Sequence, residues 1–139
     1  MFVPMRSDCP LNYGLEIFGD KWTLLIIRDL MFFGKRYYSE FLESAEGIST
    51  NILADRLNTL EQQKIITKKK SKLHKQKVIY SLTQKGIDLL PVIVAIGLWS
   101  DEYADNLNPH RDIVIGEAKR NYTQGIKSVK LRLQKMHLE

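Results

Sequence analysis

A run of lysines stands out between residues 68 and 77, because it holds six lysines and no acid. The cations are Lys68, Lys69, Lys70, Lys72, Lys75 and Lys77, with His74 among them. Ammonium groups bind phosphate as compact point charges, so a cluster of this kind favours contact with a polyanion. A solvated loop is the plainer interpretation of any charge run, and the surroundings of this one argue against it.

Those surroundings are acidic. The 139 residues carry 21 Lys and Arg against 16 Asp and Glu, a net charge of +5. Residues 1–67 sum to −2 and residues 78–118 to −4, whereas residues 68–77 contribute +6 and residues 119–139 contribute +5. The positive charge therefore lies in two patches of an otherwise acidic chain, which favours a localised contact over general adhesion to anions.

A second set of polar side chains follows Ser49, which is a good N-cap for a helix running to about Gln62. At roughly 100° per residue, Leu53, Leu57 and Leu60 share the inner face of this helix. The opposite face carries Asn51, Asp55, Asn58 and Gln62, with Thr50, Ala54 and Thr59 at its flanks. Asn can hydrogen-bond adenine, Asp can accept from cytosine, and Thr can contact the thymine methyl group. An ordinary surface helix has the same pattern, but the adjacent lysine run favours a helix that reads bases.

Arg56 lies between the two faces of this helix. It can reach a phosphate or pair with an acid of its own domain, and the sequence leaves both alternatives open. The N-terminus of the helix adds N–H groups that can bind a phosphate. The predicted DNA contacts of the helix are Ser49, Thr50, Asn51, Ala54, Asp55, Arg56 and Asn58.

The sequence before Ser49 predicts three further helices, which precede both the polar helix and the lysine run. Pro10 suits the first position of a helix that ends near Phe18. Residues 22–31 are apolar on most sides and predict a buried central helix, and a short third helix is expected over 38–44.

After this polar helix the spacing of apolar residues changes from a helical pattern to a strand-like one. Residues 65–67 and 78–82 are rich in β-branched and aromatic types and flank the lysine run, which predicts a hairpin whose loop carries the charge. Three helices, a capped fourth helix and a basic hairpin form the order of a winged helix-turn-helix. The expected fold class is mainly α with a small β-hairpin (α+β).

Beyond the hairpin, Thr83 caps a predicted helix that bends at Pro91 and runs to about Tyr103. The domain predicted over residues 1–106, with its core at 9–103, is followed by a helical extension over 107–139. One apolar stripe over about three heptads predicts a single last helix: Ile115, Ala118, Tyr122, Ile126, Val129, Leu133 and Met136. The stripe can pack on a partner subunit or on its own domain, and the basic residues beside it are interpreted as a solvated face.

Other classes of protein fit poorly. His74, His110 and His137 are scattered, and the sequence has neither a Gly-rich phosphate loop nor a cluster of ligands at metal spacing, so we expect no enzyme, cofactor or metal. The longest apolar stretch, residues 89–99, falls short of the roughly 20 residues of a membrane span. Without a signal-peptide core near the N-terminus, a cytoplasmic protein with no membrane partner is expected.

Cys9 is the single cysteine, and it precedes the predicted start of the first helix. A helix N-terminus stabilises a thiolate, whereas the neighbouring Asp8 opposes it. A reactive sensor and an inert structural thiol both remain open at this point.

Residues 9 to about 103 resemble the HxlR-type family of bacterial winged-helix transcriptional regulators. The matching stretches are Cys9-Pro10, 19–30, 38–41, 47–49, 53–61, 80–86, 90–93 and Trp99. The sequence departs from the family pattern at Tyr37, where Arg is usual, and at Lys64, where Gly is usual. The predicted hairpin also lacks the usual Pro and has Ile79 where Glu is common.

The resemblance implies a regulator that places two recognition helices of a homodimer on a palindromic operator in double-stranded DNA. It also implies a dimer interface built from the N-terminal helix, which begins at Pro10, and from the predicted helix that runs towards the C-terminus from Thr83 to about Tyr103. In several members the cysteine that Cys9 matches senses oxidants or electrophiles. The alternative function is an interaction module that contacts protein or RNA without operator-specific DNA binding.

Overall fold

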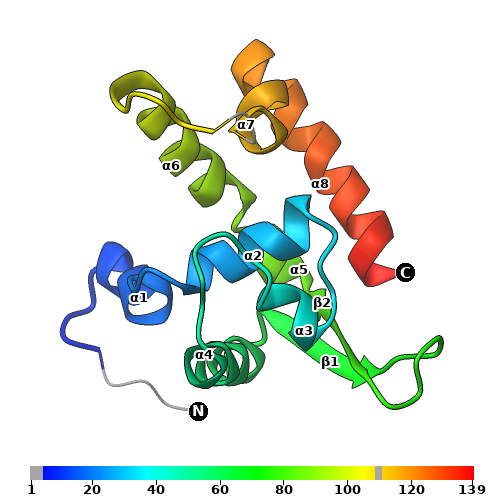
Figure 1. Ribbon diagram of the computed structural model, residues 1–139. Helices are drawn as coiled ribbons and strands as arrows, with labels where there is room; N and C mark the ends of the chain where they lie inside the picture. The colour runs from blue at the N-terminus through cyan, green and yellow to red at the C-terminus, as the bar shows by residue number, and fades with distance from the viewer. Residues whose placement is uncertain (1–4, 109–110) are drawn as a thin grey trace.

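The computed structural model describes residues 5–108 and 111–139, and of Arg111 only the backbone. Its elements in chain order are α1 (Pro10–Phe18), α2 (Thr23–Phe32), α3 (Tyr38–Phe41), α4 (Thr50–Gln62), β1 (Ile66–Lys70), β2 (Val78–Leu82), α5 (Gln84–Ile87), α6 (Leu90–Tyr103), α7 (Arg111–Arg120) and α8 (Tyr122–Leu138). The strands pair antiparallel, from Ile66 opposite Leu82 to Lys70 opposite Val78. The predicted fold class, mainly helical with a small hairpin, is therefore confirmed (Figure 1).

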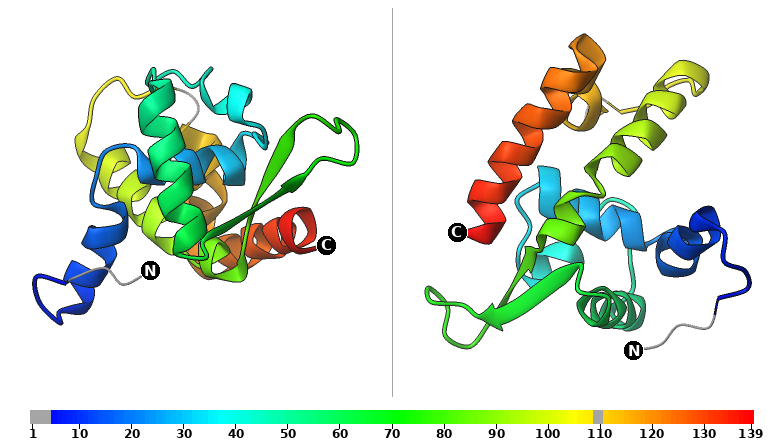
Figure 2. Two further views of the ribbon diagram at one scale, coloured as in Figure 1. Left: turned by 90° about the horizontal axis from the view of Figure 1, so that it is seen from below. Right: turned by 180° about the vertical axis from the view of Figure 1, so that it is seen from behind.

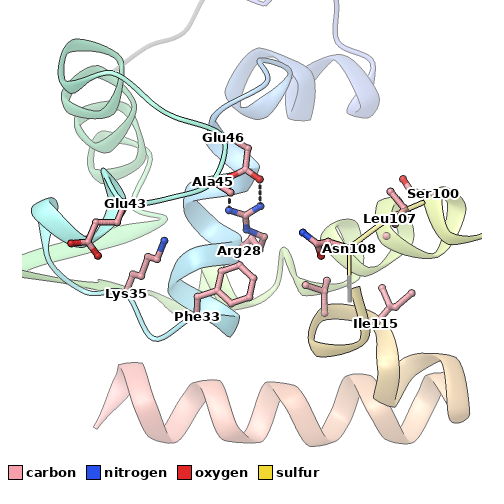
Figure 3. Close-up of a pocket in the computed structure, with 12 residues that line it drawn as sticks. Arg28, Phe33, Lys35, Glu43, Ala45, Glu46, Ser100, Leu107, Asn108 and Ile115 are labelled. Atoms are coloured by element: carbon pink, nitrogen blue, oxygen red, sulfur yellow. Dashed lines mark hydrogen bonds and ion pairs between the residues drawn. The ribbon is translucent and has the colours of Figure 1, made fainter. Parts of the chain in front are cut away.

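Helix α2 runs through the centre of the molecule and is tied to the loop that precedes α4. Arg28 donates to both carboxylate oxygens of Glu46, at 2.8 and 2.9 Å (Figure 3). The same guanidinium donates to the buried Asp29 at 2.8 Å. This network fixes the chain just before Ser49, the N-cap of α4.

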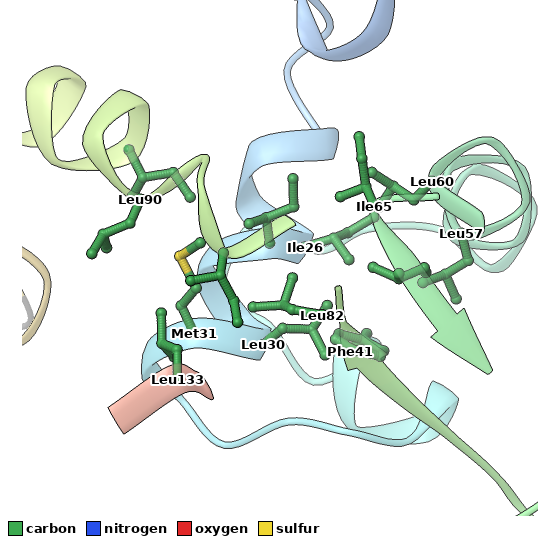
Figure 4. Packing of buried hydrophobic residues seen from close by; sticks show 14 of the residues in the cluster. Ile26, Leu30, Met31, Phe41, Leu57, Leu60, Ile65, Leu82, Leu90 and Leu133 are labelled. Carbon is green, nitrogen blue, oxygen red and sulfur yellow. The ribbon is translucent and has the colours of Figure 1, made fainter. Parts of the chain in front are cut away.

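The hydrophobic core gathers around α2, as its apolar sequence predicts (Figure 4). Ile27 and Leu30 are fully buried, and α4 packs Leu53, Leu57 and Leu60 inward, which confirms the predicted inner face of that helix. The hairpin and the helices after it contribute Ile65, Ile66, Leu82, Ile87 and Leu90. A side chain of this size contributes about 1.5–3 kcal/mol when fully buried, so the core fixes how α4 and the hairpin are presented.

Four predicted elements differ from the structure, and three of them precede α7. Strand β1 extends to Lys70, so Lys68, Lys69 and Lys70 lie on the strand and not in the loop. The helix expected to bend at Pro91 is two helices, because the chain turns at 88–89 and Pro91 takes an early position in α6, where its missing N–H costs nothing. The third helix is also shorter than expected and ends at Phe41.

The predicted last helix is likewise two helices, α7 and α8. The chain breaks at Asn121, whose side chain accepts a hydrogen bond from Gln124 N at 3.1 Å and caps α8. The two helices approach closely at Gly125, where a Cβ would lie 2.6 Å from the backbone of Glu117. Gly125 is thus required by packing.

Helix α8 packs back on its own domain, against α5 and β2 (Figure 2). Val129 and Leu133 are buried in the common core, and so is His137 near the end of the helix. His137 Nδ1 accepts from Leu82 N at 3.1 Å, and its Nε2 lies 3.1 Å from Leu30 O. The sequence left two alternatives for the apolar stripe, a partner subunit or its own domain. For Val129 and Leu133 the structure shows packing on their own domain.

Helix α1 stands apart from the body of the molecule in Figures 1 and 2. Its side chains Leu11, Tyr13 and Leu15 are exposed, and so are Trp99 and Tyr103 on α6. Within the described residues, no helix is long and apolar enough to cross a membrane.

Helix α4 ends in a strained cap. Lys64 has a φ of 60°, in the left-handed region that favours glycine. The turn is a Schellman motif, in which Ile65 N donates to Leu60 O at 2.9 Å and Lys64 N donates to Glu61 O at 3.0 Å.

We expect Lys64→Gly to raise the free energy of unfolding by about 1 kcal/mol, because it removes the Cβ strain of this turn. Urea denaturation measures the change. Lys64→Ala, which keeps the Cβ, is the control and should show no gain. Equal stability of wild type and Lys64→Gly would contradict the assignment of strain to this residue.

Candidate nucleic-acid interface

Helix α4 presents its polar face to solvent. Ser49, Thr50, Asn51, Ala54, Asp55 and Asn58 are all exposed. Its N-terminus is held by Ser49 Oγ, which accepts from Ile52 N at 3.3 Å, and by Tyr38, whose hydroxyl donates to Thr50 O at 2.8 Å. The helix therefore offers a row of short polar side chains on a fixed frame.

Arg56 pairs within its own domain. Its Nε lies 3.0 Å from Asp20 Oδ2 and its Nη1 lies 2.6 Å from Asp55 Oδ2. Asp20 also caps α2, since it accepts from Trp22 N at 2.9 Å and from Thr23 N at 3.0 Å. Partial burial opposes ionisation, but hydrogen bonds from Thr23 and Trp22 and the charge of Arg56 lower the pKa of Asp20. Of the two alternatives for Arg56, the structure contains the ion pair, which fastens α4 to the start of α2.

The two sets of side chains singled out in the sequence meet at one hollow of about 180 Å³. Ala54 and Asn58 of α4 form one wall, and Lys68 and Tyr80 of the hairpin form the other. Lys68 Nζ also lies 3.8 Å from Glu61 Oε1 across this hollow. Helix α4 and the hairpin thus form one continuous surface.

The hairpin, which we call the wing (residues 66–82), carries most of its cations without acidic partners. Within the described residues, Lys69, Lys70, Lys72 and Lys75 have no carboxylate oxygen within ion-pair distance, and all four are exposed. Lys77 Nζ lies 5.5 Å from the centre of the Tyr37 ring. Cations that are not neutralised by the protein itself are available for an external polyanion.

The base of the wing is anchored by residues that the sequence did not single out as functional. Ser71 is buried, its Oγ lies 3.0 Å from the Tyr37 hydroxyl, and it accepts from His74 N at 3.1 Å. The Tyr37 ring contacts the His74 ring edge to face, at 5.7 Å between centroids. His74 is thereby part of the frame of the wing. The departure from the family pattern at Tyr37 is the sequence signal that could have pointed to this anchor of the wing.

Arg36, in the segment between α2 and α3, fastens strand β2 of the wing. Its Nε donates to Tyr80 O at 2.7 Å and its Nη2 donates to Ser81 Oγ at 2.6 Å. Its own carbonyl accepts from Tyr80 N at 2.8 Å. Arg36 is therefore occupied by wing backbone and hydroxyl groups.

Cys9 is the N-cap of α1, the position that the sequence predicted, and its side chain is exposed. Backbone N–H groups of Asn12 and Leu11 lower the pKa of the Cys9 thiol. Helix α1, which begins directly after Cys9, and the hairpin of β1 and β2 lie apart in the fold (Figure 1).

The second basic patch is partly neutralised by its own domain. Lys119 pairs with Asp101 at 2.6 Å, Arg132 with Glu117 at 2.6 Å, and Lys130 with Asp88 at 3.3 Å. These contacts agree with the interpretation of the patch as a solvated face.

The order of elements, the capped α4 and the antiparallel basic hairpin define a winged helix-turn-helix protein. Residues 17–108 match the model of the HxlR-like helix-turn-helix family, and the chain belongs to that family. It is a transcriptional regulator of this type. Helices α7 and α8 lie outside the matched residues.

Its relatives are named as regulators. The chain is 36% identical over 101 residues to the HTH-type transcriptional regulator YodB of Bacillus subtilis, which covers 72% of this chain and 89% of YodB. An uncharacterized HTH-type transcriptional regulator of Synechocystis, sll1512, is 29% identical over 78% of this chain and 80% of its own length.

Solved structures agree with the fold. The reduced form of YodB matches with a TM-score of 0.58 and 31% identity, covering 73% of this chain and 100% of that one. The redox regulator HypR in its oxidized form matches with a TM-score of 0.62 and 28% identity, covering 70% of this chain and 100% of that one.

Proposed function

We propose that this protein binds double-stranded DNA in a sequence-specific manner, as a homodimer on a palindromic operator. The observation that carries the proposal is the continuous surface formed by the exposed polar face of α4 and the wing lysines. Residues 1–106 form the DNA-binding unit and residues 107–139 the helical extension that supports it.

The two parts of this surface have different tasks. Lysines give affinity through phosphate contacts that do not depend on sequence, whereas neutral polar side chains discriminate between base edges. Asn51 and Asn58 are exposed on α4, and among the described residues neither side chain has a hydrogen-bond partner on the protein. Specificity is therefore assigned to α4 and affinity mainly to the wing.

Replacing Asn51 with Ala should relax base preference by about 1–3 kcal/mol at one position of each half-site, while binding to non-specific DNA changes little. Competition titrations with a set of single-base operator variants measure this preference. Thr67→Ala, on the exposed side of β1, is a control expected to leave the preference intact. An unchanged preference in Asn51→Ala would assign base reading to another part of the protein.

Exposed apolar side chains support the proposed dimer. Leu11 and Leu15 on α1 are 70% and 45% exposed, and Trp99 and Tyr103 on α6 are 67% and 72% exposed. Burying such residues against a second copy would remove them from water and orient two α4 helices on one duplex. The dimer interface is assigned to α1 and α6.

We also propose that Cys9 senses oxidants or electrophiles. Its thiol is exposed at a helix N-terminus and has a lowered pKa, which favours the reactive thiolate. YodB, a relative, has been solved in reduced, quinone-bound and diamide-treated forms. One cysteine per chain allows an intersubunit disulfide, a mixed disulfide or alkylation.

Diamide or a quinone should change operator affinity by tenfold or more in the wild type and leave Cys9→Ser unchanged, because only the wild type holds a thiol. Operator titrations of reduced and treated protein measure the change, and mass spectrometry of the intact chain identifies the adduct. Identical affinity in the reduced and treated wild type would end the sensor proposal and leave the DNA-binding proposal standing.

A further inference from the structure

The wing loop (residues 71–77) joins β1 to β2 and projects from the body of the molecule (Figures 1 and 2). It carries three of the six wing lysines. Its one apolar side chain, Leu73, is 86% exposed, and of its seven residues, all of which the structure describes, Ser71 alone is buried. Because the loop buries no apolar side chain of its own, its order has to come from polar contacts.

Three residues of the loop close it on itself. Ser71 N donates to Lys77 O at 2.9 Å, and Lys77 N donates to His74 O at 2.8 Å. His74 N in turn donates to Ser71 Oγ at 3.1 Å. The buried Ser71 hydroxyl is therefore the side-chain group on which the turn is built.

Tyr37 contacts the same three residues from outside the wing. Its hydroxyl oxygen lies 3.0 Å from Ser71 Oγ, and a serine oxygen can bind this hydroxyl and the His74 N–H together. Its ring meets the His74 ring edge to face at 5.7 Å, and Lys77 Nζ lies 5.5 Å from the ring centre. One half-buried side chain thus contacts each residue that closes the loop.

Tyr37 is itself held on the body of the protein. Tyr37 N and Arg36 N donate to Glu40 Oε1 at 3.0 and 2.9 Å, which fixes the backbone at the start of α3. Phe41 at the end of α3 lies in the hydrophobic core. The contacts of Tyr37 therefore connect the projecting loop to a rigid part of the fold.

We propose that Tyr37 is a positioning residue of the proposed DNA-binding surface, which orders the wing loop before DNA binds and thereby sets the affinity that the loop lysines provide. A loop without this contact has more conformational freedom in the unbound protein. DNA would then have to order the loop as it binds, which weakens binding. The effect on affinity rests on the proposed DNA binding, whereas the order of the unbound loop does not.

Nitrogen-15 relaxation of the full chain without DNA tests the ordering. Tyr37→Phe removes the hydroxyl and keeps the ring, and it should lower the order parameters of the wing-loop amides from about 0.8 to below about 0.6, while those of β1 and β2 stay unchanged. Tyr37→Ala removes the ring as well and should lower them at least as far. Tyr122→Phe, at an exposed tyrosine that begins α8, is the matched control and should leave the loop ordered. A loop that stays ordered in both Tyr37 variants would overturn the proposal.

A double-mutant cycle with Ser71 tests the effect on DNA affinity. Tyr37→Phe should weaken duplex binding about three- to tenfold, the effect of losing one hydrogen bond, without changing the salt slope, because no lysine is lost. Ser71→Ala should weaken binding at least as much, and the double variant should bind like Ser71→Ala, because both changes remove the same hydrogen bond.

The cycle distinguishes positioning from a direct contact. A Tyr37 hydroxyl that binds DNA itself would give losses that add in the double variant. Additive losses, or unchanged affinity in a Tyr37→Phe protein whose loop is disordered, would overturn the effect on affinity. If the wild type binds no duplex at low salt, the proposed function fails together with this effect, and the relaxation data still decide whether Tyr37 orders the loop.

Discussion

Replacing the six wing lysines with glutamine should lower the affinity for any duplex about 10³-fold at roughly 0.1 M salt. The variant carries glutamine at Lys68, Lys69, Lys70, Lys72, Lys75 and Lys77. Each phosphate contact contributes close to 0.9 to the slope of log K against log salt, so the slope should fall by one unit for each lysine that contacts DNA. Fluorescence anisotropy at a series of salt concentrations measures both quantities.

A matched pair of double variants separates the wing from general charge. Lys70→Gln with Lys72→Gln removes two wing charges, and Lys127→Gln with Lys135→Gln removes two charges from α8. All four lysines are exposed, so neither change disturbs the core. The wing pair should reduce the salt slope by about two units and the α8 pair by about zero. Equal slopes in the two variants would show that the wing does not hold the phosphates.

Acidification should destabilise the protein through His137 by about 3 kcal/mol between pH 7 and pH 4. Burial and the charge of Arg36 lower the pKa of His137 to about 4 from an ordinary value of 6.5. The neutral ring is the one the fold requires, because Nδ1 accepts from Leu82 N while Nε2–H donates to Leu30 O. Protonation would place a hydrogen on the nitrogen that must accept.

The sign of the effect follows from proton binding. Between pH 6.5 and 4 the unfolded chain binds a proton at this ring and the folded chain does not, so stability falls as the pH falls. The contribution is complete above pH 7 and is lost below about pH 4.

His137→Gln is the matched variant, because a glutamine amide can donate and accept without titrating. Urea denaturation at pH 7 and pH 4 should show that wild type loses about 3 kcal/mol more than the variant. Effects of carboxylates elsewhere are common to both proteins and cancel in the difference. Equal losses would mean that His137 is not the group that makes the fold sensitive to acid.

Local signals were enough to predict the elements that form the proposed DNA-binding surface. The spacing of Leu53, Leu57 and Leu60 orients α4 because a 3.6-residue period fixes which side is buried. Ser49 and Thr83 accept backbone hydrogen bonds at helix starts, as their types predict.

Contacts between distant residues could not be predicted in the same way. Asp20 and Arg56 are 36 positions apart, and His137 and Leu30 are 107 apart, so no periodicity relates them. The break at Asn121 was missed for another reason. A stripe of apolar residues is the same for one long helix and for two short helices that bury the same side, and only the local signals of Asn121 and Gly125 distinguish them.

The central claim is that α4 and the wing bind a specific duplex as a dimer. Its most direct test is a titration of the protein with the DNA that lies upstream of its own coding sequence and with a scrambled duplex, with light scattering to give the mass of the complex. We predict two chains per site and an affinity at least about 10³-fold tighter for the upstream duplex. Failure to bind either duplex at low salt would contradict the account and favour a winged-helix module that contacts protein or RNA.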